Sequence, residues 1–197
     1  MSSVESVVGR LRGGGITGSC IDLLPYEAAD AAAVVRLRNI TEVRYFLNQE
    51  QASTLDSQLA WTSAYLQRRN DIFWILKDKT GQVVGCNRLY DISADVLEKG
   101  SLIVDQEFAR GLPIALEADL LALRCAFADF GVSHVLTRTR YDNVKMQSMN
   151  LRLGFREIGS EMLRGVQYTV HRLEKADFRP GPFENIVNHW SKRNERR

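Results

Sequence analysis

The chain has 197 residues, of which 45% are hydrophobic and 25% are charged. That length and composition are typical of one globular domain with a sizeable core. Lys and Arg number 26 against 24 Asp and Glu, which gives a net charge of +2. This near-balance gives no reason to expect nucleic acid as a partner, although a phosphate-bearing ligand needs only local positive charge.

The cysteines and the N-terminal segment indicate the cellular compartment of the protein. Cys20, Cys86 and Cys125 form no CxxC pair, and each lies in an apolar segment. Free thiols in such segments behave as small buried hydrophobes, which fits a reducing compartment. Residues 1–15 lack the continuous apolar core of a signal peptide. The longest mostly apolar helix, 114–130, contains charged side chains that exclude a membrane span. We therefore predict a cytoplasmic protein that does not cross a membrane.

The first part of the chain predicts a strand followed by short helices. Residues 1–15, which end in three glycines, are expected to form a flexible lead before a strand over 16–24. Asp30 is typical of a helix N-cap and predicts a helix over 31–38. A second short helical piece is expected over 43–47.

A longer helix is predicted to begin near Thr54 and Asp56. Helical spacing places four side chains on one stripe, with Trp61 and Tyr65 on its flanks. We expect this amphipathic stripe to pack against the rest of the domain. Its members are Leu55, Leu59, Thr62 and Leu66.

The remaining elements predict a mixed α/β fold, with a sheet that has helices on both faces. A long helix over 114–130 has apolar side chains at helical spacing, and Gly131 is a natural stop. Expected strands are 72–76, 82–90, one that ends at Val104, 132–141, 155–163 and 167–173, and further helices are 144–153 and 183–190.

The pattern divides the chain into a main domain over 16–179 and an appendage over 180–197. The appendage is expected to hold an amphipathic helix and a charged tail. Its apolar face is expected to pack on its own domain, with a dimer contact as the alternative, so both monomer and homodimer stay open. That face consists of Phe183, Ile186, Val187 and Trp190.

The most informative segment is a strand that ends at Val104 and leads through the turn 108–115 into the long helix. A glycine-containing loop at a helix start presents bare backbone N–H groups to an anion, and the helix dipole adds about half a positive charge there. This arrangement predicts a seat for a phosphate-bearing ligand. Neither a GxGxxG fingerprint nor a Walker loop is present, which argues against a dinucleotide or ordinary nucleotide site.

The loop resembles the signature of the Gcn5-related N-acetyltransferases, the GNAT family, in which Arg/Gln-x-x-Gly-x-Gly/Ala opens a helix. The matching residues are Arg110-Gly111-Leu112-Pro113-Ile114-Ala115, followed by Glu117-Ala118. Asn143 and Gly154-Phe155 match a second family motif further along. The resemblance extends over 21–173 and implies a mostly antiparallel sheet of about seven strands that is splayed in its middle.

The resemblance implies that acetyl-CoA is the co-substrate of an N-acetyltransferase. In the family, the pantetheine lies along the splayed strand and the pyrophosphate lies at the helix start. Because no His, Cys or carboxylate cluster has metal-ligand spacing, we predict no metal. The cofactor-binding residues implied are Leu102, Ile103 and Val104 in the strand, Arg110, Gly111, Leu112, Pro113, Ile114 and Ala115 in the loop, and Asn143.

Two positions depart from the family pattern. Pro113 replaces the central glycine of the loop; it suits the first turn of a helix but removes one N–H donor from the anion seat. Asn150 stands where many members have a tyrosine that protonates the departing thiolate. Asn cannot act as a general acid, although its amide can donate a hydrogen bond, and Ser148 or an ordered water is the alternative donor. The pKa of a thiol is near 8.5, so the thiolate needs only modest help.

The general base is expected near the splayed strand. Glu98 precedes it at a place where some members have a base, and Tyr90 and Asp91 end the neighbouring strand. Each carboxylate also fits a solvated turn residue. His134 and His171 fit structural or exposed positions better than catalytic ones.

The acceptor site is expected to involve Arg38, Asn39, Arg44 and Tyr45, with Tyr90. This segment resembles two branches of the family, the ribosomal-protein N-terminal acetyltransferases and the N-acetyltransferases of nucleotide-linked amino sugars. An arginine there suits a diphosphate or carboxylate. We expect a small amine, such as an amino sugar, as the acceptor. The alternatives are a protein N-terminus and a catalytically weak acyl-CoA-binding module, which Pro113 and Asn150 motivate.

Overall fold

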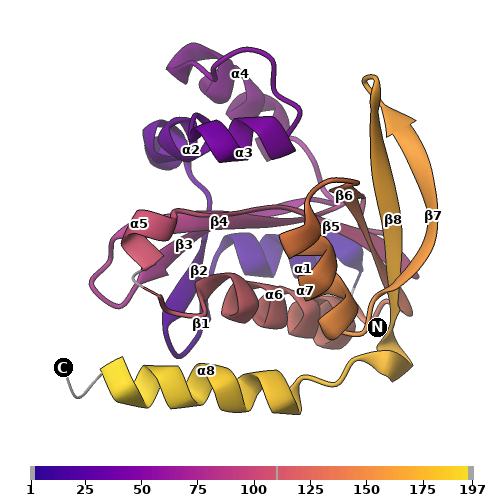
Figure 1. Ribbon diagram of the computed structural model, residues 1–197. Coiled ribbons are helices and arrows are strands. Elements are labelled where there is room, and N and C mark those ends of the chain that lie inside the picture. Colours follow the sequence, from indigo (N-terminus) through magenta and orange to yellow (C-terminus); the bar gives the residue numbers. More distant parts are fainter. Residues whose placement is uncertain (1–2, 110, 195–197) are drawn as a thin grey trace.

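The computed structural model describes residues 3–109 and 111–194, and it has one eight-stranded sheet with helices on both faces (Figure 1). The strand order is β1-β2-β3-β4-β5-β6-β8-β7. Every neighbouring pair is antiparallel except β5 and β6, which are parallel. The predicted fold class is confirmed. The extra strand arises because the expected strand over 16–24 folds back on itself, with the Gly18 N–H donating to the Ile21 carbonyl at 2.9 Å.

The element bounds follow the predicted order closely. The strands are β1 (Ile16–Thr17), β2 (Ile21–Pro25), β3 (Ile72–Asp78), β4 (Val83–Tyr90), β5 (Val96–Val104), β6 (His134–Arg140), β7 (Arg156–Leu163) and β8 (Val166–Glu174). The helices are α1 (Val4–Arg12), α2 (Ala31–Arg38), α3 (Thr41–Phe46), α4 (Leu55–Leu66), α5 (Gln106–Ala109), α6 (Ile114–Cys125), α7 (Val144–Arg152) and α8 (Gly181–Asn194). The short turns η1 (Ala28–Asp30) and η3 (Lys175–Asp177) are 3₁₀ helices, and η2 (Ala126–Phe130) is a π turn that extends α6 to the predicted stop at Gly131.

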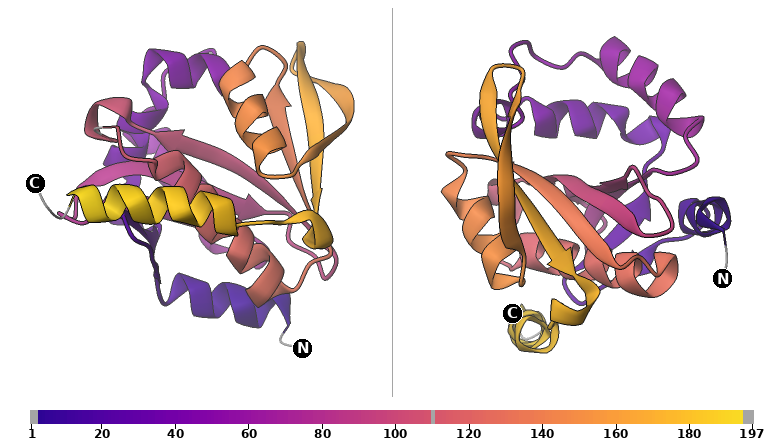
Figure 2. Two further views of the ribbon diagram at one scale, coloured as in Figure 1. Left: turned by 60° about the horizontal axis from the view of Figure 1, so that its bottom comes forward. Right: turned by 90° about the vertical axis from the view of Figure 1, so that its right-hand side faces the viewer.

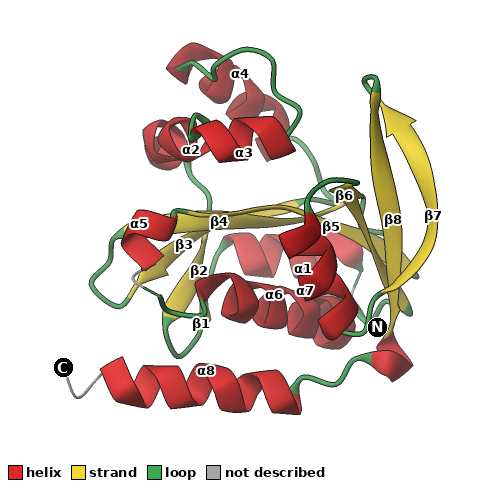
Figure 3. Cartoon of the chain, viewed as in Figure 1, coloured by secondary structure: helices red, strands yellow, loops and turns green. Residues whose placement is uncertain are grey.

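The helices divide the core between the two faces of the sheet (Figure 3). The larger hydrophobic cluster joins the sheet to α1, α6 and α8, with Trp74, Leu97 and Ala118 at its centre. The smaller cluster joins the sheet to α2 and α4, with Leu37 and Phe73 among its buried members. We call the first the α6 face and the second the α4 face.

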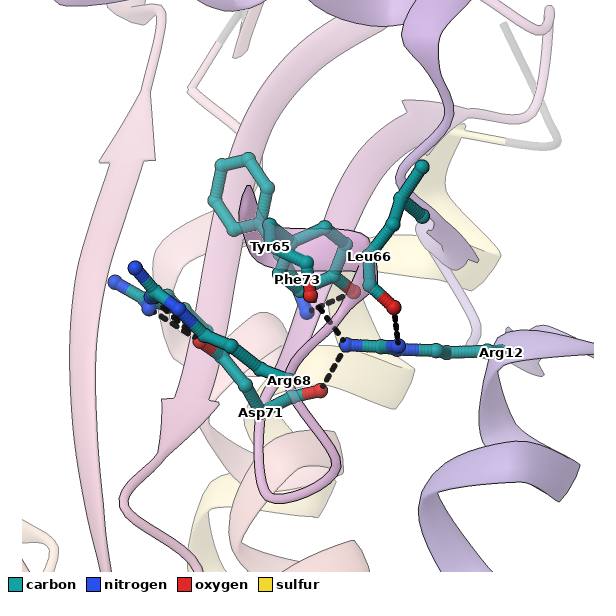
Figure 4. A network of polar contacts seen from close by, with 7 residues as sticks. Arg12, Tyr65, Leu66, Arg68, Asp71 and Phe73 are labelled. Atoms are coloured by element: carbon teal, nitrogen blue, oxygen red, sulfur yellow. Dashed lines mark hydrogen bonds and ion pairs between the residues drawn. The ribbon is translucent and has the colours of Figure 1, made fainter. Parts of the chain in front are cut away.

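The N-terminal segment is ordered rather than a flexible lead, so that expectation is wrong. Residues 4–12 form α1, whose Val7, Val8 and Leu11 are buried in the larger cluster. Arg12 then fixes the helix to the α4–β3 loop, because its guanidinium donates to the carbonyls of Tyr65, Leu66 and Asp71 at 3.1, 3.3 and 3.1 Å (Figure 4). Apolar side chains at helical spacing explain the helix, since they bury one face against the sheet.

Helix α4 begins as expected but turns a different face inward. Thr54 caps it, and Thr54 and Ser57 form a capping box. The expected stripe is wrong at its three leucines, since Leu55, Leu59 and Leu66 are exposed. Thr62 is buried as expected, together with Gln58 and Tyr65. This face turns inward because the buried Tyr26 hydroxyl needs hydrogen-bond partners on α4. It bonds the Thr62 hydroxyl at 2.6 Å and accepts from the Gln58 amide at 3.2 Å.

The cap expected at the start of α2 is also different. The Asp30 side chain accepts from the Glu27 N–H at 2.9 Å and so closes the preceding 3₁₀ turn, while it makes no cap hydrogen bond to α2. Helix α2 therefore continues directly from η1. The sequence pattern located the helix start within a residue but assigned the carboxylate to the wrong turn.

The C-terminal helix packs along α6 (Figure 2). Val187 is buried, Phe183 is partly buried and Ile186 is exposed, so the predicted apolar face is only partly covered. The three cysteines are free and buried, as expected. None of the helices in the described ranges is long and apolar enough to cross a membrane.

Candidate functional site

The parallel strands β5 and β6 separate in the middle of the sheet. They pair only from Val96 opposite His134 to Lys99 opposite Thr137. Beyond Lys99, strand β5 stays paired with β4 on its other side, through Ile103 opposite Cys86. The edge of β5 over 100–104 that faces β6 therefore has no strand partner among the described residues. The expected splay is present, and it includes Leu102, Ile103 and Val104.

A β-bulge produces this separation. The register between β4 and β5 shifts at Cys86–Arg88, and Ser101 has φ of 52°, a left-handed conformation that few residues adopt. A Cβ at Gly85 would lie 2.2 Å from the Ile103 carbonyl oxygen. Only glycine fits there, because β4 and the bulged strand approach so closely.

The loop between α5 and α6, where the sequence predicts the anion seat, has fewer free N–H donors than the sequence indicated. Gly111 adopts φ of 76°, which favours glycine. The N–H groups of Leu112 and Ile114 are occupied, since they donate to the carbonyls of Ala109 and Leu112 at 2.9 and 2.8 Å. Within the described ranges, Ala115 and Leu116 have no acceptor for their N–H groups. Arg110 lies outside the described residues.

The start of this loop is tied to the α4 face. Asp105 is buried, and its carboxylate accepts from the Arg36 guanidinium and, at 3.1 Å, from the Glu107 N–H. The Arg36 guanidinium also lies 5.1 Å from the centre of the Phe108 ring. Helix α2 therefore fixes where β5 ends and where the loop begins.

Glu98 lies on the α4 face of β5, just before the splay, and is 7% exposed. Its carboxylate accepts from the Tyr90 hydroxyl and from the Arg138 guanidinium, and Arg138 also pairs with Glu161 on β7. Burial raises the pKa of Tyr90 to about 12, so its hydroxyl stays protonated and can donate. Glu98 is thus held in a fixed orientation at the point where the strands part.

A cavity of about 200 Å³ opens on the same face, between α2, α4 and the bulge. The Arg88 guanidinium connects it to the Glu98 cluster, because it lies 4.7 Å from the centre of the Tyr90 ring and 5.3 Å from that of Trp61. The cavity is lined by Val34, Arg38, Ser53, Ser57, Gln58, Trp61, Phe73, Arg88 and Ser101.

Of the predicted acceptor residues, only Arg38 is among those that line the cavity, and Tyr90 lies next to Arg88 outside the lining. Asn39 instead bonds the backbone of Ser53 in both directions, at 2.8 and 2.9 Å, and so fixes one wall. Arg44 donates to the Glu50 carbonyl at 2.8 Å. Tyr45 is half-exposed; its ring lies under Arg140 and its hydroxyl donates to Asp142. Among the described residues, only Asn39 of these three forms hydrogen bonds with a residue that lines the cavity.

Asn150 lies on the α6 face and is completely buried. Its amide donates to the Thr139 hydroxyl at 3.0 Å and accepts from the Lys99 ammonium at 3.4 Å. Lys99 in turn forms an ion pair with Asp119 of α6, and the side chains are 2% and 0% exposed. The residue that replaces the family tyrosine is therefore part of a buried polar network at the apex of the splay.

Two other predicted residues lie on α7. Asn143 caps this helix by accepting from the Met146 N–H at 3.1 Å, and Ser148 is partly exposed. Their roles toward a ligand stay predictions. Within the described ranges, no three His, Cys, Asp or Glu side chains gather as metal ligands.

Sequence reasoning missed most of the cavity lining. Trp61 was assigned to the flank of the wrong stripe of α4, Gln58 was not singled out, and Arg88 and Arg138 carried no signal of their own. Arg88 alternates with Leu89 along β4, which indicates only that it faces the opposite side of the sheet. The pairing of residues from α2, α4, β4 and β6 depends on the tertiary fold.

Comparison with known proteins agrees with this geometry. A family profile described as "Acetyltransferase (GNAT) domain" matches residues 21–156, which is more than half of the chain. No curated protein matches the chain.

Solved structures match the fold at low sequence identity. FdhC in its apo form, a nucleotide-linked sugar GNAT, has a TM-score of 0.74 at 19% identity and covers 88% of this chain and 97% of its own. A spermidine N-acetyltransferase from Vibrio cholerae in complex with CoA and spermine has a TM-score of 0.73 at 17% identity, covering 81% and 98%. A GCN5-related N-acetyltransferase from Brucella melitensis has a TM-score of 0.73 at 18% identity, covering 90% and 85%.

Proposed function

Because the chain belongs to the GNAT family of acetyl-CoA-dependent N-acetyltransferases, we propose that it transfers the acetyl group to the primary amine of a small molecule held in the cavity between α2 and α4. The observation that carries this proposal is the splay of β5 from β6, with an oriented carboxylate, Glu98, on the cavity side of the sheet. The splay offers an unpaired strand edge to the pantetheine.

The cofactor side is formed by β5 and the start of α6. The pyrophosphate would lie at the α6 N-terminus, where the Ala115 and Leu116 N–H groups are free and the helix dipole favours an anion. The pantetheine amides would bond the free backbone edge of Leu102 to Val104. Pro113 removes one donor, but it already lies at the N-cap, where α6 needs no N–H from it.

The chemistry proposed is direct attack in a ternary complex. The amine nitrogen forms a bond to the thioester carbonyl carbon, the C–S bond breaks, and its electron pair leaves with the sulfur as thiolate. Backbone N–H groups of the splayed strand stabilise the oxyanion. Glu98 accepts the proton that the amine loses, and Tyr90 and Arg138 hold its carboxylate in place.

The cavity supports a small acceptor over a protein N-terminus. Helix α4 contributes Ser57, Gln58 and Trp61 to the lining, and the volume of about 200 Å³ suits a small molecule better than several residues of a peptide. The second candidate, a binding module with little activity, is motivated by Asn150, which is fully buried in the Lys99 network. That network leaves no tyrosine hydroxyl at this position to protonate the thiolate.

The test begins with a calorimetric titration of the purified protein with acetyl-CoA, with ATP and NAD as controls. Selective micromolar binding followed by amine-dependent release of free thiol would support the enzyme. Binding without any thiol release from a broad amine panel would favour the binding module. No binding at millimolar acetyl-CoA would refute both.

A further inference from the structure

Arg38 is the one guanidinium of the cavity without a counter-charge. Among the residues that the structure describes, no carboxylate or carbonyl accepts a hydrogen bond from it. It is nevertheless largely covered, and this burial, with the nearby positive charge of Arg88, lowers the pKa of Arg38. A covered cation without a partner is costly, because desolvation is not compensated by pairing.

The contrast with Arg88 shows that the fold neutralises such charges elsewhere. Asp71 is 2% exposed and accepts from Arg88 through both carboxylate oxygens and from Arg68 at 3.0 Å. It is fixed in turn at the α4–β3 loop, where Arg12 holds its carbonyl (Figure 4). The second arginine of the cavity is thus fully paired within the protein, whereas Arg38 is not.

The other residues that line the cavity include no carboxylate that could pair with Arg38. Ser53, Ser57 and Gln58 are polar but neutral, and Trp61 and Phe73 are aromatic. The cavity is therefore positively charged. A cationic polyamine would meet repulsion there, whereas an oxyanion would find a planar donor and neighbouring hydroxyl groups.

The position of Arg38 also limits where the anion lies relative to the amine. Ser101, at the bulge that opens the splay, lines the same cavity. Arg38 and Ser101 thus line one cavity of about 200 Å³. A cavity of that size holds one small molecule, so the anion at Arg38 and the amine at the bulge belong to the same ligand.

We propose that the acceptor is an anionic primary amine, whose carboxylate or phosphate pairs with Arg38 while its amine lies at the Ser101 bulge. This inference rests on the proposed acetyl transfer and names its substrate class. An anionic acceptor would distinguish this chain from the spermidine N-acetyltransferase, although the two share a fold.

The test compares matched acceptors in the transfer assay. Each pair contrasts an amine that carries a carboxylate or phosphate, called the anionic member, with one that lacks this group, called the neutral partner. Serine is compared with serinamide, and glucosamine 6-phosphate with glucosamine. Spermidine is the polycationic acceptor. We expect the wild type to use the anionic member of at least one pair with a kcat/KM about ten-fold or more above its neutral partner. The pair that shows the preference distinguishes carboxylate from phosphate. Equal use of neutral partners, preferred use of spermidine, or no transfer to either anionic amine would overturn the proposal.

Variants then assign the preference to Arg38. Arg38→Gln is expected to reduce the anionic-to-neutral ratio to about one, mainly through KM, and Arg38→Lys to keep part of it. Arg69→Gln is the matched control, because Arg69 is exposed and pairs with Glu5 outside the cavity. A preference that survives Arg38→Gln would overturn the proposal. Acetyl-CoA titration of the wild type and of each variant distinguishes the proposed acetyl transfer from the proposed acceptor class. A wild type that does not bind acetyl-CoA would refute the transferase itself.

Discussion

Glu98 and Lys99 are consecutive on β5 but face opposite sides of the sheet, and the two sides treat their charges differently. Lys99 on the α6 face is sealed from water, with Asp119 and Asn150 as partners. Glu98 on the α4 face is held by Tyr90 and Arg138 beside a cavity that contains a guanidinium without a partner. One face satisfies its charges internally, and the other leaves a charge for a ligand.

The difference teaches which polar residues belong to the fold and which to the function. A buried ion pair contributes little net stability but becomes very costly when one partner is removed. A charge that the fold leaves unpaired costs stability in the free protein, and that cost is recovered only when a ligand binds. The predictions below test this division, beginning with the largest expected effect.

Removing one charge from the α6 face should destabilise the protein most. Asp119→Asn leaves the Lys99 ammonium buried without a counter-charge, and we expect a loss of about 3–5 kcal/mol in the free energy of unfolding. Urea unfolding at pH 7 measures it. The double variant Lys99→Met/Asp119→Leu should recover most of the loss, because apolar groups replace both charges.

The control for this experiment is an ion pair on the surface. Lys145 and Glu42 lie 3.5 Å apart, with side chains 90% and 60% exposed. Lys145→Met should change the unfolding midpoint little, since exposed pairs are screened by solvent. A loss below about 1 kcal/mol for Asp119→Asn would mean that water reaches Lys99, and the division between the faces would fail.

Changing the carboxylate on the α4 face should affect turnover instead of stability. Glu98→Gln keeps the shape and the hydrogen bond from Tyr90, and we expect kcat to fall about 100- to 1,000-fold because the proton acceptor is lost. Acetyl-CoA affinity should be unchanged, since the cofactor site we propose is formed by the backbone edge of β5 and the start of α6. Steady-state kinetics and calorimetry measure the two quantities.

Glu161→Gln is the matched control for Glu98. Glu161 also pairs with Arg138 but lies on β7 and is partly exposed. We expect kcat to fall less than about ten-fold, because only the support of Arg138 is weakened. If Glu98→Gln retained more than a tenth of wild-type kcat, Glu98 would not be the base.

The sequence predicted the order of the elements along the chain, the family and the position of the loop, because these depend on local patterns in the chain. It predicted the wrong buried face for α4, since apolar side chains occupy more than one side of that helix. The buried face is determined by Tyr26, whose buried hydroxyl needs Gln58 and Thr62 as hydrogen-bond partners. No local pattern contains that requirement.

The site was predicted in part for the same reason. Glu98 and Arg38 were singled out as candidates from their places near the family motifs, and their roles stay predictions. Their partners Arg138 and Trp61 come from elements 40 and 23 residues further along the chain. Contacts of this kind depend on the tertiary fold, and so does the distinction between a paired Arg88 and an unpaired Arg38.

The loop on the cofactor side gives a smaller prediction. Gly111 has φ of 76°, and no atom lies within 4 Å of a Cβ placed there, so Gly111→Ala adds backbone strain alone. We expect the dissociation constant for acetyl-CoA to rise about five-fold, which corresponds to about 1 kcal/mol. Gly165→Ala at the β7–β8 turn is the control, with φ of 75° and the same open space. It should lose similar stability but bind acetyl-CoA normally, and equal affinities for the two variants would place the pyrophosphate elsewhere.

The smallest expected effect concerns pH and the sealed α6 face. His171 on β8 is buried on the same face as Leu173, and this burial, assisted by Lys99 and opposed by Glu157, lowers the pKa of His171 below its ordinary value of 6.5. As the pH falls below 6.5, the unfolded chain therefore binds a proton before the folded chain does, and the free energy of unfolding decreases. His171→Gln should flatten urea-unfolding stability between pH 7 and 5, whereas His189→Gln on the exposed side of α8 should not. If His171→Gln keeps the wild-type slope of unfolding free energy against pH, carboxylates cause that slope. The α6 face would then be insensitive to protons in this range.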